Sequence, residues 1–255
     1  MKLPSTSLKG KVAVVTGGGG GLGTLAACTF GAAGADVVIV GKTAAKCEKT
    51  AEQVRALGGR ALAIEANVTS AGDVSRMVEL TLNEFGTIDV LFNNAGVNSP
   101  KALEESSEAE WFRVIEVNVK GTFLVTKAIL PVMKARRSGK IINMASVTSR
   151  VGLANRTAYS ASKAAIAQIT RSLALEMGPH GINVNAIGPA VIVTDLNRDL
   201  IKTQPALYDG MLKRMAMGRF GEPRDLSGPL IFLASQASDF VTGQVLYVDG
   251  GYTAG

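Results

Sequence analysis

A tyrosine and a lysine lie one helical turn apart in the segment Tyr159-Ser160-Ala161-Ser162-Lys163, which begins a long helical pattern. Residues at this spacing share one face of a helix, so the phenol and the ammonium group are expected to be neighbours. An ammonium group beside a tyrosine stabilises the phenolate and lowers its pKa from about 10 toward the working pH of a general acid/base. The pair alone is a weak signal, because an ordinary helix surface also explains it.

A glycine-rich turn follows the strand-like residues 12–16. Glycine lets the backbone turn sharply and approach a pyrophosphate closely, while the free N–H groups and the positive dipole end of a following helix attract the anion. The run fits two patterns, G-x-G-x-x-G through Gly18, Gly20 and Gly23, or T-G-x-x-x-G-x-G through Thr16, Gly17, Gly21 and Gly23. Strand, glycine loop and helix start together predict a dinucleotide site.

The end of the second strand usually selects the dinucleotide, because an acidic side chain there accepts hydrogen bonds from the ribose of NAD. Asp36 stands at the start of this strand, too early to reach, and the strand ends at Gly41-Lys42-Thr43. Lys42 and the Thr43 hydroxyl could bind a 2′-phosphate, which a carboxylate would repel. We therefore predict NADP(H), with NAD(H) possible; the alternative is that Lys42 is a solvated surface lysine, since the glycine loop carries no basic residue.

Strand-like runs rich in Val and Ile alternate with longer helical patterns along the whole chain, which is typical of βαβ units around a parallel sheet. We expect strands near 12–16, 36–41, 61–66, 88–92, 139–145, 182–188 and 244–248. Helices are expected at 22–33, 43–57, 71–85, 108–136, 157–179 and 224–235. The pattern predicts one α/β domain over residues 1–255, with a doubly wound parallel sheet of about seven strands and helices on both faces.

The alternation fails at residues 189–222, which carry Pro189, Pro205 and Gly210 and are expected to be irregular. Because ligands bind at the carboxyl ends of strands in such sheets, a long insertion here predicts a substrate lid. Met211, Met215 and Met217 in this segment suit a flexible apolar lid, or else they fill gaps in the core.

Composition excludes several classes of protein. The chain has 255 residues, 47% of them hydrophobic, and a net charge of +6, which excludes a disordered polymer. Cys28 and Cys47 have no partners at metal-ligand spacing, so we expect no disulfide framework and no metal site. Residues 12–35 are uncharged, but their glycines break any membrane helix.

The distribution of charge gives no sign of a nucleic-acid partner. The densest basic cluster, residues 134–140, closes a helical pattern, where cations meet the C-terminal dipole. The first residues carry no apolar segment of the kind a signal peptide needs, so a cytoplasmic protein is expected.

Other polar residues stand in a fixed order before the Tyr/Lys pair. Asn93-Asn94-Ala95-Gly96 follows the fourth strand, Asn118 lies in the next helical pattern, and Ser146 follows the fifth strand. With the glycine turn, this set resembles the short-chain dehydrogenase/reductase family from Leu8 to Gly251. The resemblance is to carbonyl and 3-oxoacyl reductases and to sugar-acid dehydrogenases, all on the Rossmann fold.

The resemblance implies four catalytic residues. Tyr159 would exchange a proton with the substrate oxygen, Lys163 would lower its pKa and hold the nicotinamide ribose, and Ser146 would stabilise the charge that develops on that oxygen. Asn118 would support a water-linked proton path behind Lys163. The family's C-terminal pattern, similar to residues 239–251, implies a homotetramer.

The resemblance also implies a set of cofactor contacts: Gly17, Gly21, Leu22, Gly23, Lys42, Thr43, Asn67, Val68, Asn94, Ala95, Gly96, Tyr159, Lys163, Pro189, Ile192 and Thr194. The chain departs from the family twice. Asn67-Val68 replaces an aspartate near the adenine, and Pro189-Ala190 replaces Pro-Gly after the sixth strand.

The implied reaction interconverts a ketone and a secondary alcohol with NADP(H). The alternatives are an NAD(H)-dependent sugar-acid or polyol dehydrogenase, and a nicotinamide-binding sensor without turnover. Arg150 and Arg156, between Ser146 and Tyr159, could hold a substrate carboxylate or phosphate, or could be solvated loop arginines.

Overall fold

The computed structural model describes residues 3–194, 198–203 and 205–255 of the chain. Seven strands form its sheet: β1 (Val12–Thr16), β2 (Asp36–Gly41), β3 (Ala61–Glu65), β4 (Val90–Asn93), β5 (Gly139–Met144), β6 (Ile182–Pro189) and β7 (Val245–Val248). All pairs are parallel, in the order β3-β2-β1-β4-β5-β6-β7. The predicted doubly wound parallel sheet is confirmed, and each strand lies within two residues of its expected limits.

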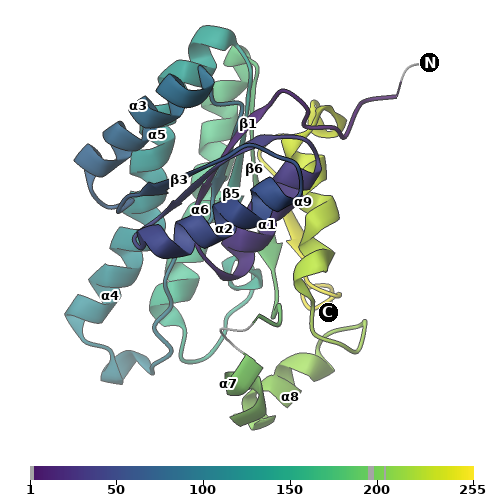
Figure 1. Ribbon diagram of the computed structural model, residues 1–255. Helices are drawn as coiled ribbons and strands as arrows, with labels where there is room; N and C mark the ends of the chain where they lie inside the picture. Colours follow the sequence, from purple (N-terminus) through teal and green to yellow (C-terminus); the bar gives the residue numbers. More distant parts are fainter. Residues whose placement is uncertain (1–2, 195–197, 204) are drawn as a thin grey trace.

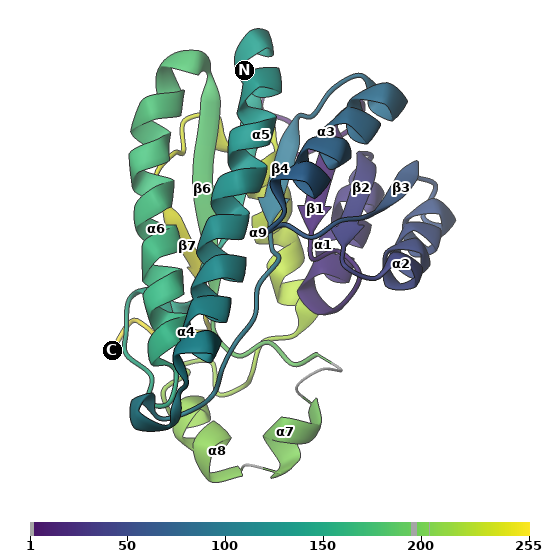
Figure 2. The same cartoon turned by 90° about the vertical axis from the view of Figure 1, so that its left-hand side faces the viewer.

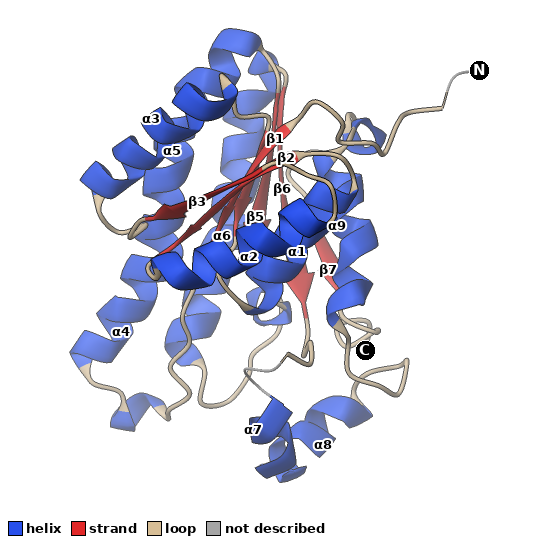
Figure 3. Cartoon of the chain, in the orientation of Figure 1, coloured by secondary structure: helices blue, strands red, loops and turns tan. Residues whose placement is uncertain are grey.

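The helices of the described chain are α1 (Gly21–Ala32), α2 (Ala44–Ala56), α3 (Ala71–Phe85), α4 (Glu108–Ile115), α5 (Gly121–Arg136), α6 (Thr157–Met177), α7 (Arg198–Thr203), α8 (Pro205–Lys213) and α9 (Ser227–Ala234). Apart from α4, α7 and α8, they form two layers that enclose the sheet (Figure 1, Figure 3). None of the helices in this described part has both the length and the apolar character needed to cross a membrane.

Burial of the sheet on both faces explains why its strands are nearly continuous apolar runs. Along β1, Ala13 and Val15 belong to the core shared with α1, α2 and α9, whereas Val12 and Val14 belong to the core shared with α3, α5 and α6. Figure 2 shows α3, α5 and α6 across that second face. The alternation of side chains along each strand thus supplies both cores.

The region 108–136, expected as one helix, is two helices joined by a π-helix at Glu116–Lys120. Gly121 allows the chain to approach Val68 closely, since a Cβ at Gly121 would lie 2.8 Å from Val68 Cγ2. Asn118, inside the π-helix, bonds to residues of other elements rather than facing solvent. Helical periodicity could not predict this interruption, because it results from tertiary contacts.

The region 189–222, expected to be irregular, contains the short helices α7 and α8, which lie beyond the carboxyl edge of the sheet (Figure 1). The expected lid segment includes residues 195–197 and 204, which are outside the described residues. Pro205 begins α8, a position where its missing N–H costs nothing. Met211 of α8 and Met215, which follows this helix, are buried in one cluster with Val147.

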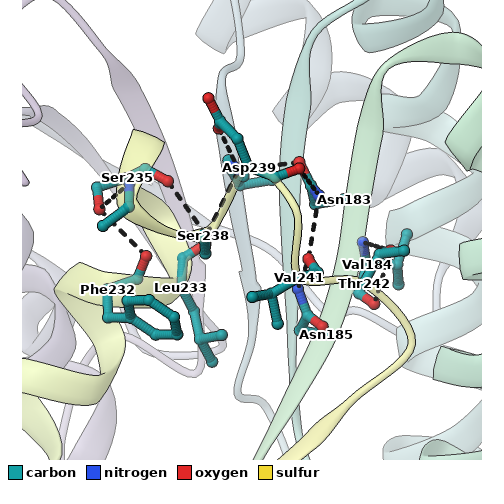
Figure 4. Close-up of polar contacts among 12 residues, drawn as sticks. Asn183, Val184, Asn185, Phe232, Leu233, Ser235, Ser238, Asp239, Val241 and Thr242 are labelled. Carbon is teal, nitrogen blue, oxygen red and sulfur yellow. Dashed lines mark hydrogen bonds and ion pairs between the residues drawn. The ribbon is translucent and has the colours of Figure 1, made fainter. Parts of the chain in front are cut away.

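The loop before β7 is fastened to β6 by side-chain amides (Figure 4). Asn185 Nδ2 donates to the carbonyl oxygen of Val241 at 2.8 Å, and Asn183 Nδ2 donates to the same oxygen at 3.0 Å. Thr242 Oγ1 accepts from the backbone N–H of Val184 at 3.1 Å. These bonds fix the start of the last strand on the edge of the sheet.

Candidate active site

The glycine turn lies where the strand order reverses, between β1 and β4. Gly17 has a φ of 63°, and a Cβ there would lie 2.9 Å from the Cα of Ala95. A Cβ at Gly23 would run into the carbonyl oxygen of Gly17. Gly20, the N-cap of α1, has no side chain to satisfy the first N–H groups of that helix, which leaves them for an anion. This cradle fits a dinucleotide pyrophosphate.

Asn94 fastens the glycine turn to the end of β4. Its Nδ2 donates to the carbonyl oxygens of Thr16 at 3.0 Å and Gly17 at 3.2 Å. The Thr16 hydroxyl accepts from the backbone N–H groups of Asn94 and Ala95, each at 3.1 Å. The carboxyl ends of β1 and β4 therefore form one rigid rim.

Asn93 holds the middle of the sheet rather than facing the rim. Its Nδ2 donates to Thr126 Oγ1 and to Asn143 Oδ1, both at 2.9 Å, and Asn143 Nδ2 donates to Thr170 Oγ1 at 3.0 Å. The three partners of this buried network come from β5, α5 and α6. It joins the helix that carries Tyr159 to the central strands.

A cavity of about 840 Å³ opens at this rim, a volume typical of small-molecule sites. It is lined by most of the predicted site residues: Gly17, Gly21, Leu22, Asn94, Ala95, Gly96, Ser146, Tyr159, Lys163, Pro189, Ile192 and Thr194. The glycine turn and the Tyr/Lys pair thus share one cavity, as a dinucleotide and a second ligand reacting with it would require.

Three polar side chains of this cavity are placed by the start of α6 and the end of β5. Lys163 Nζ lies 5.5 Å from the centre of the Tyr159 ring and donates to the carbonyl oxygen of Met144 at 2.7 Å. Ser146 Oγ accepts from the backbone N–H of Thr148 at 3.1 Å, which fixes its rotamer beside the cavity. The predicted neighbourhood of Tyr159 and Lys163 is therefore present.

Burial sets the protonation of this pair. It raises the pKa of Tyr159, whereas hydrogen bonding with Ser146 and the charge of Arg156 lower that pKa. Burial lowers the pKa of Lys163 to about 8, because a buried ammonium loses its hydration. The sequence predicted that Lys163 lowers the tyrosine pKa; in the structure burial dominates and raises that pKa, and Ser146 and Arg156 are the groups that oppose the rise.

Asn118 does not line the cavity but lies behind it. Its Nδ2 donates to Ser162 Oγ at 2.9 Å and to the carbonyl oxygen of Val97 at 3.0 Å, and its Oδ1 accepts from the Val97 N–H at 2.8 Å. Ser162 Oγ donates in turn to the carbonyl oxygen of Tyr159 at 2.7 Å. Asn118 therefore connects the π-helix to the first turn of α6.

Five predicted cofactor residues are not among the lining residues of this cavity: Gly23, Lys42, Thr43, Asn67 and Val68. Val68 is buried in the core against Gly121, and Asn67 Oδ1 accepts from the N–H and the hydroxyl of Thr69. Thr43 is the N-cap of α2.

Sequence reasoning missed Lys46, Arg113 and Tyr208 as members of the site, although all three line the cavity, as does Met211 of the expected lid. A Cβ at Gly19 would lie 3.0 Å from the Cβ of Lys46, so this lysine stands directly beside the glycine turn. Its helical spacing from Lys42 was the only available signal. Arg113 lies on a helix and Tyr208 on a segment expected to be irregular, and neither carries a motif.

Comparison with known proteins agrees with this geometry. A family model described as enoyl-(acyl carrier protein) reductase matches residues 18–253. The chain is 41% identical to the "(2S)-[(R)-hydroxy(phenyl)methyl]succinyl-CoA dehydrogenase subunit BbsD" of Thauera aromatica, over 96% of this chain and 97% of that protein. It is 39% identical to 5-keto-D-gluconate 5-reductase of Escherichia coli K12, over 96% of each.

The chain is also similar to a solved structure over nearly its whole length. The gluconate 5-dehydrogenase of Burkholderia cenocepacia J2315, in complex with NADP and tartrate, superimposes with a TM-score of 0.94 over 98% of each chain, at 36% identity. The chain therefore belongs to the short-chain dehydrogenase/reductase family, whose members in these comparisons are oxidoreductases.

The burial of Lys163 can be measured directly. In protein labelled with ¹³C at lysine Cε, we expect the NMR signal of Lys163 to titrate near pH 8. An unperturbed lysine has a pKa of about 10.4. Lys163→Met assigns the signal by removing it. A Lys163 signal that titrates together with the surface lysines would contradict the geometry described above.

Proposed function

We propose that this chain interconverts a ketone and a secondary alcohol with NADP(H), using Tyr159 as general acid/base. The observation that carries the proposal is the shared cavity of the glycine turn and the Ser146, Tyr159 and Lys163 side chains. When bound, the nicotinamide cofactor supplies or accepts the hydride.

Each polar residue then has one task. In the reducing direction Tyr159 donates its phenolic proton to the substrate oxygen as that oxygen gains negative charge, and in the oxidising direction it takes the proton back. Ser146 donates a hydrogen bond to the same oxygen, which stabilises its charge in the transition state. Lys163 would hold the nicotinamide ribose of the bound cofactor, and Ile192 and Thr194 would contact its nicotinamide end. Asn118 positions the first turn of α6 and supports a water-linked proton path.

The substrate side of the cavity is formed in part by the segment at 189–222, which we propose acts as a lid on the single catalytic domain 1–255. Tyr208 and Met211 of α8 line the cavity from this segment. Among the substrates that the family resemblance left open, a sugar-acid ketone is supported by the relative named as a 5-keto-D-gluconate reductase. A 3-oxoacyl thioester and a broad range of simple ketones remain the alternatives.

We further propose a cytoplasmic homotetramer. Large apolar side chains are exposed on helices α4, α5 and α6, at Phe112, Phe123 and Leu175, the last of them 81% exposed. In the proposed tetramer these side chains are covered by neighbouring subunits. Cys28 and Cys47 are both free, as expected in a reducing compartment.

NADP(H) is supported by the Burkholderia relative solved with NADP and by the cations beside the glycine turn. Lys46 faces this turn from α2, and Lys42 is exposed at the end of β2. We propose that both bind the 2′-phosphate, so that the preferred cofactor is NADP(H) rather than NAD(H).

Charge reversal tests this selectivity. Lys42→Asp and Lys46→Asp should each reduce the preference for NADPH over NADH by about tenfold, the effect of losing one charge-assisted bond of roughly 1.5 kcal/mol. The measurement is the ratio of the two dissociation constants from quenching of protein fluorescence. Lys49→Asp, an exposed change on the same helix, is the matched control. Unchanged ratios in both variants would contradict the assignment.

Removal of one hydroxyl tests the proposed chemistry. Tyr159→Phe should lower kcat by about 100-fold or more, the usual contribution of general acid catalysis, while NADPH still binds. The matched control is Tyr247→Phe, whose hydroxyl lies 3.0 Å from Ser149 Oγ outside the cavity. A Tyr159→Phe enzyme as fast as wild type would refute the mechanism.

A further inference from the structure

The charges that line the active-site cavity are of one sign. Lys46, Arg113, Arg156 and Lys163 all line it, and among its described lining residues there is no Asp or Glu. Two of these cations already have a place in the proposed chemistry: Lys46 beside the glycine turn, and Lys163 beside Tyr159. Arg113 and Arg156 are left for the substrate.

Arg156 lines the same cavity as Tyr159 and lies near it in the chain. It is the N-cap of α6, three residues before Tyr159, and both side chains line the cavity. Its guanidinium interacts electrostatically with the phenol groups of Tyr159 and Tyr208. A carboxylate bound by Arg156 would therefore lie only a few bonds from the carbonyl group whose oxygen Tyr159 protonates.

Arg156 also lacks a counter-charge within the described part of the chain. Its side chain is half-buried, and Nη1 donates to the carbonyl oxygen of Asn155 at 2.9 Å, with no carboxylate in contact. By contrast, the exposed Arg60 and Arg219 pair with Glu84 and Asp225, at 2.7 Å each. A partly desolvated guanidinium with free donors binds a carboxylate well, because its planar fork matches two oxygens.

The other arginine that the sequence singled out lies elsewhere. The guanidinium of Arg150 is 5.8 Å from the centre of the Tyr247 ring, and Arg150 lines a separate hollow together with Arg171. The two arginines of one loop thus face different sites. Only Arg156 faces Tyr159.

We propose that Arg156 selects substrates that carry a carboxylate close to the reacting carbonyl or hydroxyl, so that the enzyme acts on short keto acids and hydroxy acids. This inference rests on the proposed function and narrows its substrate class. It disfavours 3-oxoacyl thioesters, whose neutral chain would leave this cation unpaired beside the reacting carbon. The phosphate groups of the carrier to which such a thioester is attached lie many bonds farther from the reacting carbonyl group.

Pairs of ligands that differ only in charge test the proposal. The probes are D-gluconate against D-gluconamide and lactate against lactamide, titrated into the NADPH-loaded protein, with NADPH fluorescence as the readout. No hydride transfer takes place in these complexes. Wild type should bind the acid of at least one pair about tenfold or more tightly than its amide, and Arg156→Gln should remove that difference.

Two further variants separate charge from shape. Arg156→Lys should keep part of the discrimination, and Arg150→Gln should keep all of it. Loss of Arg156 also removes a charge that lowers the pKa of Tyr159, but that effect acts on acids and amides alike, whereas loss of a carboxylate contact weakens binding of the acid alone.

The outcomes distinguish this inference from the proposed function. The inference is wrong if wild type binds the acid and the amide of every pair equally well, or if Arg156→Gln still prefers the acid. This holds even when neutral ketones are reduced. If binding of acids depends on Arg156 but no ketone or alcohol is turned over, the inference stands and the proposed function fails.

Discussion

The site depends on the rigid junction of two strand ends. β1 and β4 are neighbours in the sheet, and the chain leaves them toward opposite sides, so a crevice opens between their carboxyl ends. Asn94 and Thr16 close this junction with four hydrogen bonds. Two are donated by the side-chain amide of Asn94, and two are accepted by the Thr16 hydroxyl from backbone N–H groups. Glycine at position 17 is required because the backbone at Ala95 leaves no space for a Cβ. The cavity that holds Tyr159 opens at this junction.

Electrostatics at the other end of the cavity follow from burial. Both charged forms of the Tyr159 and Lys163 pair are disfavoured by the loss of water, so each side chain is moved toward neutrality. Arg156 opposes this for the tyrosine, since a cation near the phenol stabilises the phenolate. The same guanidinium can therefore tune the acid and bind the substrate, which links specificity to catalysis through one residue.

Local patterns in the sequence predicted most of the scaffold and the central site. The β-branched runs predicted all seven strands, because a strand buried on both faces must be apolar throughout. The types and order of Ser146, Tyr159 and Lys163 predicted that they belong to one site, and the three side chains line one cavity. The π-helix, the helices α7 and α8, and the positions of Lys46 and Arg113 at the cavity could not be found in this way, because contacts between distant segments determine them. In the sequence, Arg150 and Arg156 were equal candidates for binding a substrate acid group. The path of the loop places only Arg156 at the active-site cavity, whereas Arg150 lines a separate hollow.

The most direct test of the central claim is NADPH consumption by the purified protein with a panel of ketones: sugar-acid ketones, 3-oxoacyl thioesters, cyclic ketones and aryl ketones. We expect turnover of the sugar-acid ketones, faster with NADPH than with NADH. Absence of turnover with every ketone, while NADPH still binds, would contradict the assignment of this cavity as the active site of a carbonyl-reducing enzyme.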